Sequence, residues 1–272
     1  MRSRWAPGRM ESVAPVCLHN KATIEKLLRR EVYLQLYGIG DLDDFFWPYT
    51  TWYAESGLAE SSPIALVYTG MSLPTLLIFS ARTQEASQLL ASIAHLLPQH
   101  FHAHLSAGLE AALLKTHHLD SHGTYLKMGL LNKVAAENCD CASTCRLGPS
   151  DAGEITAFYA HSYPGNWFDP RMLETGQYFG VRQNGTLASI AGVHVYSRQY
   201  GVAALGNIAT THAERNKGYA RQATARVCQS LLVDASHVGL NVKADNAAAI
   251  ACYQKLGFET VGSYGEYMVD IQ

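Results

Sequence analysis

Hydrophobic residues in the first half of the chain recur at two spacings, one typical of helices and the other typical of strands. A three- and four-residue spacing over residues 23–36 and 83–97 predicts two amphipathic helices, and Gly38 and Gly40 end the first of them. Short apolar runs bounded by glycine or proline predict strands. The remaining elements predicted for this half are strands at 64–68, 75–79, 101–105 and 124–131 and a helix at 108–116.

The second half alternates more regularly between the same two patterns. Asn184 and Gly185 separate two apolar runs, and this pair favours the tight turn of a β-hairpin. Asn246 begins the last predicted helix, and Gly257 ends it. The predicted order is a strand at 145–147, helices at 151–161 and 170–175, strands at 178–182, 186–196 and 202–211, a helix from 219, a strand at 239–243, a helix at 246–256, and strands at 258–261 and 266–271.

A polar segment with small residues and cysteines, residues 132–143, separates the two halves and is the best candidate for a linker. Helices and strands alternate on either side of it, so the whole chain is predicted to be α/β, in the broad sense that includes α+β. This division predicts an N-terminal α/β domain at 13–142 and a second domain at 143–272. Residues 1–12 are basic and lack an apolar segment, so we expect them to form a solvated, disordered tail.

A glycine-bearing loop lies between the apolar run at 202–211 and the helix that begins at Tyr219. Its sequence is Arg215-Asn216-Lys217-Gly218-Tyr219-Ala220-Arg221. A glycine turn that opens a helix presents unpaired backbone N–H groups and the positive end of the helix dipole, which suit a phosphate or pyrophosphate. Gly218 lets the backbone approach such a group closely, and the basic side chains add positive charge. The simpler interpretation is a helix start with a solvated basic face.

A second block, about thirty residues later, reads Asp245-Asn246 and then Tyr253-Gln254-Lys255-Leu256-Gly257-Phe258. With this block, the loop resembles the first motif of the GCN5-related N-acetyltransferase (GNAT) family, which is Arg or Gln, two residues, Gly, one residue, and Gly or Ala. The resemblance covers about residues 143–272. It implies the acetyltransferase fold, a mixed central sheet flanked by helices, here preceded by a second α/β domain. That N-terminal domain is similar in layout to the degenerate GNAT-like domain of two-domain members such as the glycine N-acyltransferase-like group.

The resemblance also implies which residues hold acetyl-coenzyme A (acetyl-CoA), the cosubstrate of the family. The backbone of the glycine loop would bind the pyrophosphate, and the strand before the loop would pair with the pantetheine arm. The cofactor-binding residues implied in this way are Ile208, Ala209, Thr210, Arg215, Asn216, Lys217, Gly218, Tyr219, Ala220, Arg221 and Asn246. Tyr253 matches the family tyrosine that protonates the leaving thiolate as a general acid. The structural alternatives are a helix N-cap for Asn246 and a core position for Tyr253.

The general base is not evident from the sequence. Many family members place a glutamate eleven residues before the first position of the motif, where this chain has Ala204. His194, which alternates with apolar neighbours, or a chain of water molecules could take this role, and direct attack on a thioester needs only a weak base. Trp167 and Phe168 lie in a loop that would wall the acceptor pocket, although surface packing explains them equally well.

Composition narrows the class of partner and the compartment. The 272 residues carry a net charge of −2, which implies no broad attraction to nucleic acid or to an anionic membrane. No apolar run reaches the roughly 20 residues of a membrane-spanning helix, and the N-terminus lacks the apolar segment of a secretory signal. The six cysteines suggest no disulfide framework, and Cys139, Cys141 and Cys145 lack the paired spacing of a structural zinc site. We therefore expect no metal and a cytoplasmic location.

The sequence thus predicts an acyl-CoA-dependent N-acyltransferase, most simply an N-acetyltransferase, that moves an acetyl group from acetyl-CoA to a primary amine of a small molecule by direct attack. Two alternatives stay open: a CoA-binding regulatory module with weak catalysis, which Ala204 would favour, and a protein or peptide N-acetyltransferase. The sequence also leaves open the acceptor, the acyl-chain preference, the choice between monomer and homodimer, and the start at Met1 or Met10.

Overall fold

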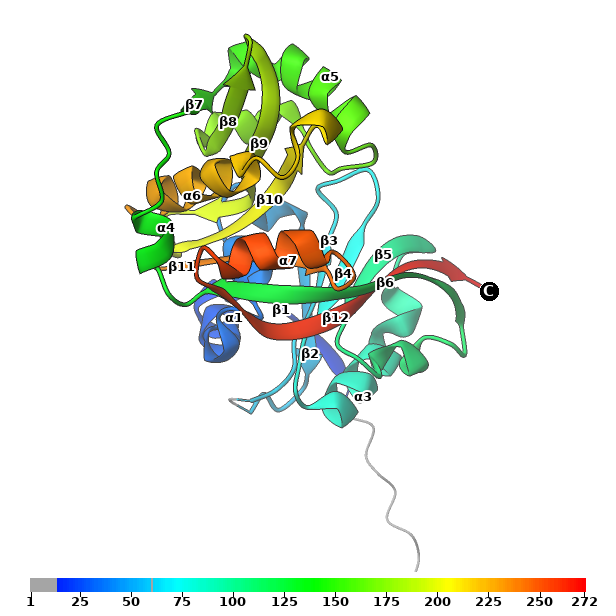
Figure 1. Cartoon of the computed structure of the whole chain (residues 1–272). Helices are drawn as coiled ribbons and strands as arrows, with labels where there is room; N and C mark the ends of the chain where they lie inside the picture. The colour runs from blue at the N-terminus through cyan, green and yellow to red at the C-terminus, as the bar shows by residue number, and fades with distance from the viewer. Residues whose placement is uncertain (1–13, 60) are drawn as a thin grey trace, which may run out of the picture.

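The structure is a computed structural model that describes residues 14–59 and 61–272 (Figure 1). The basic tail predicted at 1–12 lies outside the described residues. The described chain is a mixed α/β fold in which helices flank one twelve-stranded sheet, so the predicted fold class is confirmed. The strand order is β1-β2-β3-β4-β5-β12-β6-β11-β10-β9-β8-β7.

Each half of the chain contributes a similar series of elements to this sheet. The N-terminal half contains β1 (Pro15–Leu18), α1 (Lys21–Leu28), α2 (Leu36–Gly40), β2 (Thr50–Glu55), β3 (Ala65–Tyr68), β4 (Thr75–Ile78), α3 (Thr83–Ile93), β5 (His100–Leu105) and β6 (His117–Leu130). The C-terminal half contains α4 (Val134–Glu137), β7 (Thr144–Leu147), α5 (Ala152–Ser162), β8 (Tyr178–Gln183), β9 (Thr186–Ser197), β10 (Val202–Thr210), α6 (Tyr219–Leu231), β11 (His237–Lys243), α7 (Ala247–Gln254) and β12 (Phe258–Ile271). The short 3-10 helices are η1 (Arg29–Glu31), η2 (Trp47–Tyr49), η3 (Ala94–Leu96), η4 (Leu109–Ala112), η5 (Pro149–Asp151), η6 (Pro170–Thr175) and η7 (His212–Glu214).

The two halves repeat one arrangement around a pair of parallel strands. β4 and β5 run parallel and are connected through α3, while β10 and β11 run parallel and are connected through α6. In each half, the first strand of the parallel pair is the last of three consecutive antiparallel strands, which are β2, β3 and β4 in one half and β8, β9 and β10 in the other. The connection from β4 to α3, residues 79–82, contains no glycine, whereas Gly218 precedes α6. The glycine loop therefore belongs to the C-terminal half of the repeat.

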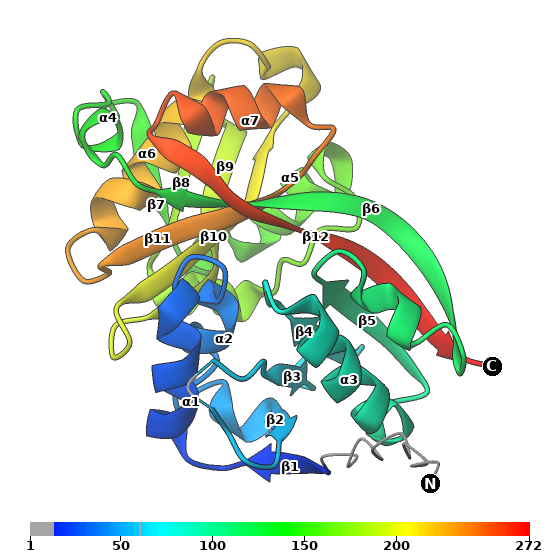
Figure 2. The same ribbon diagram turned by 90° about the horizontal axis from the view of Figure 1, so that it is seen from below.

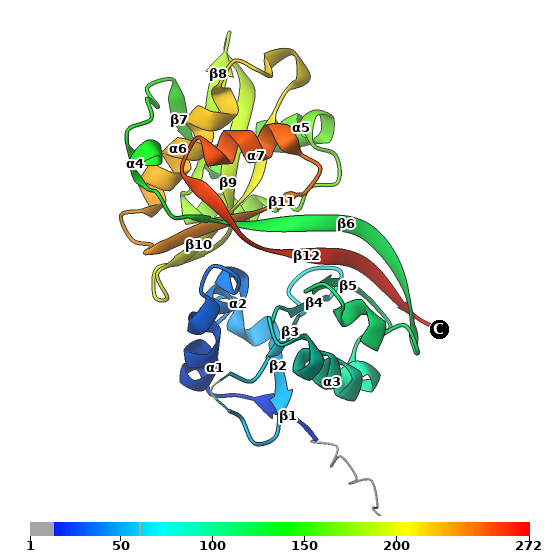
Figure 3. The same cartoon turned by 60° about the horizontal axis from the view of Figure 1, so that its bottom comes forward.

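The halves exchange their last strands. β6, from the N-terminal half, lies between β11 and β12, and β12, from the C-terminal half, lies between β5 and β6. The exchanged strands pair antiparallel along their length, from Phe258↔Leu130 to Ile271↔His117. Figure 2 and Figure 3 show them, in green and red, running side by side between the two halves. The sheet of each half therefore contains a strand supplied by the other half.

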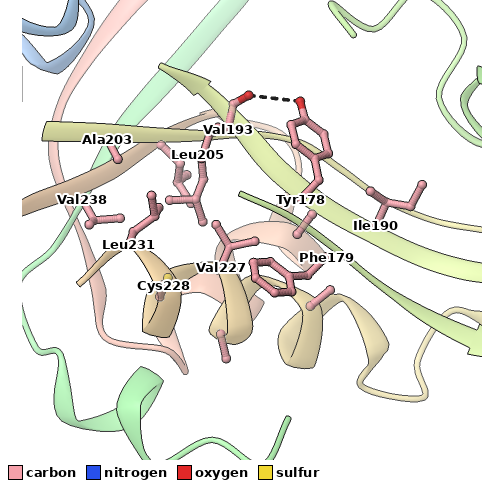
Figure 4. Packing of buried hydrophobic residues seen from close by; sticks show 14 of the residues in the cluster. Tyr178, Phe179, Ile190, Val193, Ala203, Leu205, Val227, Cys228, Leu231 and Val238 are labelled. Atoms are coloured by element: carbon pink, nitrogen blue, oxygen red, sulfur yellow. Dashed lines mark hydrogen bonds between the residues drawn. The ribbon is translucent and has the colours of Figure 1, made fainter. Parts of the chain in front are cut away.

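Apolar cores fill the space between the sheet and the helices. In the C-terminal half, Val227 and Leu231 of α6 pack against strand residues that include Phe179 and Val238 (Figure 4). A second core joins α3 to β3, β4 and β5, and a third lies against α1 and α2. The third core includes Tyr264 of the exchanged β12, so the exchange joins the halves through side chains as well as through the sheet.

The helix predicted at 23–36 is interrupted. α1 ends at Leu28, η1 follows, and α2 begins only at Leu36. At the interruption the Tyr33 ring packs on Gly129 of β6 and the Leu36 side chain packs on Gly239 of β11, so closely that a Cβ at either glycine would overlap them. The helix is interrupted because these contacts with distant strands stabilise the chain more than the weak local preference of this segment for a helix.

Other predicted elements have different lengths in the structure. The helix predicted at 108–116 is the short η4, and the strand predicted at 124–131 is the end of β6. The two closing strands predicted at 258–261 and 266–271 are one strand, β12, whose register shifts after Thr260 and after Glu266. The residues added to these strands lie where β6 and β12 pair with each other. They were not predicted as strand because polar and apolar residues do not alternate there.

The polar segment at 132–143 is attached to the C-terminal half. It forms α4, and Nε2 of Gln229 in α6 donates hydrogen bonds to the carbonyl oxygens of Ala136 and Cys139, both at 3.0 Å. The Cys141 thiol donates to the carbonyl oxygen of Gln222, also in α6. Because these bonds hold the backbone of the segment, it connects the halves without acting as a free linker.

We expect a fragment of residues 143–272 to lack a cooperative fold. Without the N-terminal half, β11 has an open edge and β12 loses β5 and β6, its neighbours on both sides. Thermal unfolding followed by circular dichroism tests this, with the full chain as the control. If the fragment melts as sharply as the full chain, the C-terminal half does not depend on the exchanged strands for its folding.

Lys127 of β6 is buried among aromatic rings near the boundary between the halves. The residue is 2% exposed, and Nζ lies 3.8 Å from the centre of the Phe79 ring and 5.3 Å from that of Tyr264. The ring faces attract the ammonium group, but burial opposes its charge and lowers the pKa of Lys127 to about 7.

Lys127→Met should stabilise the protein near neutral pH, by about 1–4 kcal/mol, because an apolar side chain of similar length removes the desolvated amine. The lysine pKa is lower in the folded than in the unfolded chain, so its destabilising effect is complete below about pH 7 and disappears as the pH rises toward 10.5. Urea unfolding across this pH range should show the advantage of the variant shrinking. Lys115→Met, at an exposed lysine, should show no such trend, and a less stable Lys127→Met would contradict the prediction.

Candidate active site

β10 and β11 separate in the middle of the sheet. They pair in parallel only from Val202↔His237 to Leu205↔Leu240. Beyond this point β10 stays paired with β9, and β11 stays paired with β6. Residues 206–210 of β10 therefore present an edge that β11 does not cover. An extended ligand with amide groups can pair with such an edge.

An irregular turn of β10 lies at the point of separation. The register with β9 shifts between Gly206 and Ala209, and Asn207 has a positive φ of 54°. The Tyr159 hydroxyl donates to the carbonyl oxygen of Asn207 at 2.5 Å, and Asn207 Nδ2 donates to the Tyr178 hydroxyl oxygen at 2.9 Å. These buried bonds fix the bulge, because breaking any of them would leave polar groups unpaired.

The glycine loop places free backbone N–H groups beside this edge. Asn216 and Gly218 have positive φ values of 65° and 82°, and α6 begins at Tyr219. No side chain caps the N-terminus of α6, and the first amide bonded inside the helix is that of Gln222, which donates to the Gly218 carbonyl oxygen. A Cβ added at Gly218 would meet nothing within 4 Å. The loop is thus open, electropositive and suited to an anion.

The free edge of β10, the glycine loop and α7 line one cavity of about 1230 Å³. Of the residues predicted from the sequence, those that line it are Ile208, Ala209, Thr210, Arg215, Asn216, Gly218, Tyr219, Ala220, Arg221, Asn246 and Tyr253. Lys217 is the exception: its Nζ lies 3.0 Å from Glu214 Oε2, and its side chain is half exposed outside the cavity lining. The structure therefore brings together every predicted site residue but one, while their roles remain predictions.

Asn246 and Tyr253 lie at opposite ends of α7. The Asn246 side chain accepts a hydrogen bond from the Ala249 backbone N–H at 3.2 Å, so it is the N-cap of the helix while it also lines the cavity. Tyr253 is 7% exposed and packs against Phe258. Burial raises the pKa of Tyr253 above its ordinary value, so the phenol holds its proton at neutral pH.

The two positions considered for a general base differ in their access to the cavity. Ala204 is fully buried in β10 between Val195 and Gly239 and does not line the cavity. His194 of β9 does line it, with Nδ1 3.3 Å from the Tyr37 hydroxyl. Its Nε2 has no hydrogen-bond partner among the described residues. Burial lowers the pKa of His194, so the imidazole is neutral and can accept a proton.

Trp167 and Phe168 have different positions. Trp167 lines the cavity, and its ring centre lies 5.1 Å from that of His102. Phe168 packs between Tyr159 and Tyr178, next to the bulge of β10, and does not line the cavity. Trp167 therefore stays a candidate for the wall of the acceptor pocket. Phe168 instead packs against the tyrosines that hold the bulge of β10.

The cavity continues into the N-terminal half, for which no motif was predicted from the sequence. The lining side chains from this half are mainly aromatic and apolar and include one buried carboxylate. They are Tyr37, Asp41, Phe46, Tyr68, Met71, Thr75, Leu77, His104 and Tyr125. Tyr264 and Glu266 of the exchanged β12 also line it. Among these residues, Phe46 belongs to an aromatic-rich stretch of the sequence, residues 45–53, which is a signal that could have pointed to this wall.

Potential metal ligands gather at one place among the residues that the structure describes. Ligand atoms of His102, His122 and Glu266 lie within 4.8 Å of one another, on β5, β6 and β12. The cysteines at 139, 141 and 145 are free thiols and form no such group within this part of the chain. The absence of a metal therefore stays a prediction. None of the helices at 14–59 and 61–272 has the length and apolar character that crossing a membrane requires.

Comparisons with known proteins agree with this geometry. Residues 146–258 match the sequence model of the Acetyltransferase (GNAT) family, so this segment is a GNAT domain. No curated protein sequence matches the chain. The loop at 215–221, the free edge of β10 and α7 all lie within the matched segment.

Solved structures extend the likeness of fold beyond this domain. A Drosophila protein covers 94% of this chain and 98% of its own, with a TM-score of 0.68 and 12% identity. A tandem GNAT protein from the clavulanic acid biosynthesis pathway covers 95% and 97%, with a TM-score of 0.53 and 15% identity. A putative GNAT acetyltransferase from Novosphingobium aromaticivorans covers 75% and 90%, with a TM-score of 0.53 and 21% identity. At these identities the likeness establishes the fold alone, and one of these structures is described as a tandem GNAT protein.

Gly218→Asp should abolish binding of acetyl-CoA in isothermal titration calorimetry, because a carboxylate would stand at the N–H groups that suit a phosphate. Gly185→Asp is the matched control, since Gly185 has a φ of 83° against 82° at Gly218 and is equally open around its Cβ position. Both variants should lose stability of about 1–3 kcal/mol from the left-handed backbone, but only the first should lose binding. Equal affinities in the two variants would contradict a phosphate site at Gly218.

Proposed function

We propose that this protein is an acyl-CoA-dependent N-acyltransferase that transfers an acetyl group from acetyl-CoA to a primary amine of a small molecule. One observation carries the proposal: the glycine loop, the free edge of β10 and Tyr253 line a single cavity that continues along a wall from the other half. A cosubstrate and an acceptor can meet there. The GNAT domain at 146–258 supports the same conclusion.

The residues of the cavity fit acetyl-CoA. The N–H groups at the start of α6, together with Arg215 and Arg221, would hold the pyrophosphate. The free edge at 208–210 would pair with the amides of the pantetheine arm, and Asn246 would contact the same arm from the start of α7. When bound, acetyl-CoA supplies a thioester whose carbonyl carbon can accept an amine.

Direct attack requires a neutral amine and a proton for the leaving group. As the new C–N bond forms and the C–S bond breaks, the amine loses a proton and the thiolate gains one. Tyr253 would protonate the thiolate, since its buried phenol retains a proton. His194 would accept the amine proton, directly or through a water molecule, because its imidazole is neutral and lines the cavity, and direct attack on a thioester needs only a weak base.

A CoA-binding regulatory module is the second candidate, and the Ala204 position favours it, because no carboxylate is present there to act as a base. Release of thiol from acetyl-CoA, measured against a panel of amines, amino acids and peptides, separates the candidates. Turnover on a small amine supports the enzyme, and turnover on peptides alone would indicate a protein acetyltransferase. Binding of acetyl-CoA without turnover on any acceptor would favour the regulatory module.

Tyr253→Phe should reduce turnover by about a hundredfold or more while leaving the affinity for acetyl-CoA near normal, since it removes the acidic proton but keeps the ring. Tyr200→Phe is the matched control: Tyr200 is also 7% exposed, but it packs in a core outside the cavity. Steady-state thiol release and calorimetry on both variants provide the comparison. Equal loss of binding and turnover at Tyr253 would indicate a packing role, and unchanged turnover would remove it from the mechanism.

A further inference from the structure

Asp41 is a buried carboxylate without a partner on the N-terminal wall of the cavity. It follows α2 directly, where its backbone N–H donates to the Tyr37 carbonyl oxygen at 2.8 Å. The residue is 6% exposed and lines the cavity. Within residues 14–59 and 61–272, its side chain forms no hydrogen bond or salt bridge. Burial raises the pKa of this carboxyl group to about 8, in agreement with the lack of a compensating charge.

The neighbouring Asp43 differs from Asp41 because both of its carboxylate oxygens accept hydrogen bonds, as expected of an aspartate with a structural role. Its Oδ1 accepts a hydrogen bond from the Phe45 backbone N–H at 3.2 Å, and its Oδ2 accepts one from the Ser197 hydroxyl at 2.7 Å. Asp41 has no comparable bonds, although it is more deeply buried than an isolated carboxylate should be. With a pKa of about 8, the Asp41 carboxyl group is largely protonated at neutral pH on its own, and a cationic ligand in the cavity would supply the partner that lets it ionise.

Aromatic rings surround the same part of the cavity. Tyr37, Phe46 and Tyr68 line it with Asp41, and the ring centres of Phe46 and Tyr68 are 6.2 Å apart. Aromatic faces next to a carboxylate attract ammonium groups. The nearby Arg171 is already paired with Asp169 at 2.8 Å, so it does not neutralise this region. Lys127 Nζ lies 5.4 Å from the centre of the Tyr37 ring but outside the cavity lining, and burial lowers its pKa to about 7, so its positive charge is weakened at neutral pH.

The other acidic residues that line the cavity have neighbours of their own. Glu266 Oε2 lies 3.6 Å from His104 Nε2, and its Oε1 lies 3.8 Å from His122 Nδ1. Glu214 lies 3.0 Å from Lys217 Nζ, and Asp245 lies 3.8 Å from Lys243 Nζ. Asp41 lacks any such neighbour among the described residues, so it is the acidic group of the lining that is left for a ligand cation.

The position of Asp41 relative to the β10 opening indicates which nitrogen it would hold. The His194 ring lies against Gly206, where β10 leaves β11, and its Nδ1 lies 3.3 Å from the Tyr37 hydroxyl. Burial and the nearby Asp41 carboxylate raise the pKa of the Tyr37 phenol, so Tyr37 connects the opening with Asp41. A nitrogen held by a carboxylate stays protonated and cannot attack a thioester. Asp41 therefore suits a second nitrogen, remote from the one that reacts.

We propose that the acceptor is an aliphatic diamine or polyamine, whose unreacted, protonated nitrogen is bound by Asp41 between the rings of Tyr37 and Tyr68. This inference rests on the proposed acetyltransferase function and names its substrate class. It also assigns a role to the N-terminal half, which lacks a glycine loop but supplies the specificity of the shared cavity.

The test compares 1,4-diaminobutane with n-butylamine and glycine as acceptors of the acetyl group. The wild-type protein should prefer the diamine over butylamine in kcat/KM by about tenfold to a hundredfold, the effect of one hydrogen-bonded charge. Asp41→Asn should reduce this ratio to near one. Asp44→Asn, at an exposed aspartate three residues away, removes the same charge and should keep the ratio. Should Asp41→Asn fail to fold, Tyr68→Leu removes a ring of the same site and should lower the ratio.

A second measurement separates this inference from the proposed function. Calorimetry in the presence of coenzyme A should show that 1,4-diaminobutane binds the wild-type protein and butylamine does not. Acetylation of butylamine or glycine without preference for the diamine would overturn the inference while the proposed function stands. If no amine is acetylated, the proposed function fails, and diamine binding that Asp41→Asn abolishes still supports the cation site. The absence of both turnover and diamine binding would overturn both.

Discussion

The antiparallel pairing of β6 with β12 joins the two halves of the chain that together line the cavity. β6 occupies the edge of β11 that faces away from β10, and it holds β11 from Gly239 to Lys243. β10 is held separately by β9, so the two parallel strands diverge beyond Leu205. The exchange also carries Tyr264 and Glu266 from the C-terminal half to the wall that the N-terminal half forms. A site divided between two halves therefore follows from one strand pairing.

The bulge at Asn207 lies where β10 separates from β11 and shifts its register with β9. At the separation point the backbone of β10 would otherwise present unpaired groups to an apolar core. The Tyr159 hydroxyl donates to the Asn207 backbone carbonyl oxygen, the Tyr178 hydroxyl accepts from the Asn207 side-chain amide, and Phe168 packs between the two tyrosines. These two buried bonds offset the strain of the positive φ at Asn207. The bulge is therefore a stable part of the fold, and it opens the edge that a ligand can use.

The sequence predicted the C-terminal half well because the relevant signals there are local. The Asn184–Gly185 hairpin, the glycine loop and the N-cap at Asn246 each depend on a few consecutive residues, and all three occur in the structure. The exchange could not be predicted in this way, because it depends on the pairing of polar residues 117–124 with a strand more than a hundred residues away. The break after Leu28 has the same origin, since Tyr33 packs on a glycine of β6.

The N-terminal wall of the cavity was missed for a related reason. Tyr37, Asp41 and Tyr68 come from two separate elements and share no spacing that a motif could express. What distinguishes Asp41 exists only in three dimensions: it is a buried carboxyl group with no hydrogen-bond or ionic partner among the described residues. Lys127 shows that burial alone does not indicate a ligand, because its ammonium group lies over aromatic rings and outside the cavity lining. The combination of burial, a missing partner and access to the cavity is found at Asp41, and this combination connects the N-terminal half to the choice of acceptor.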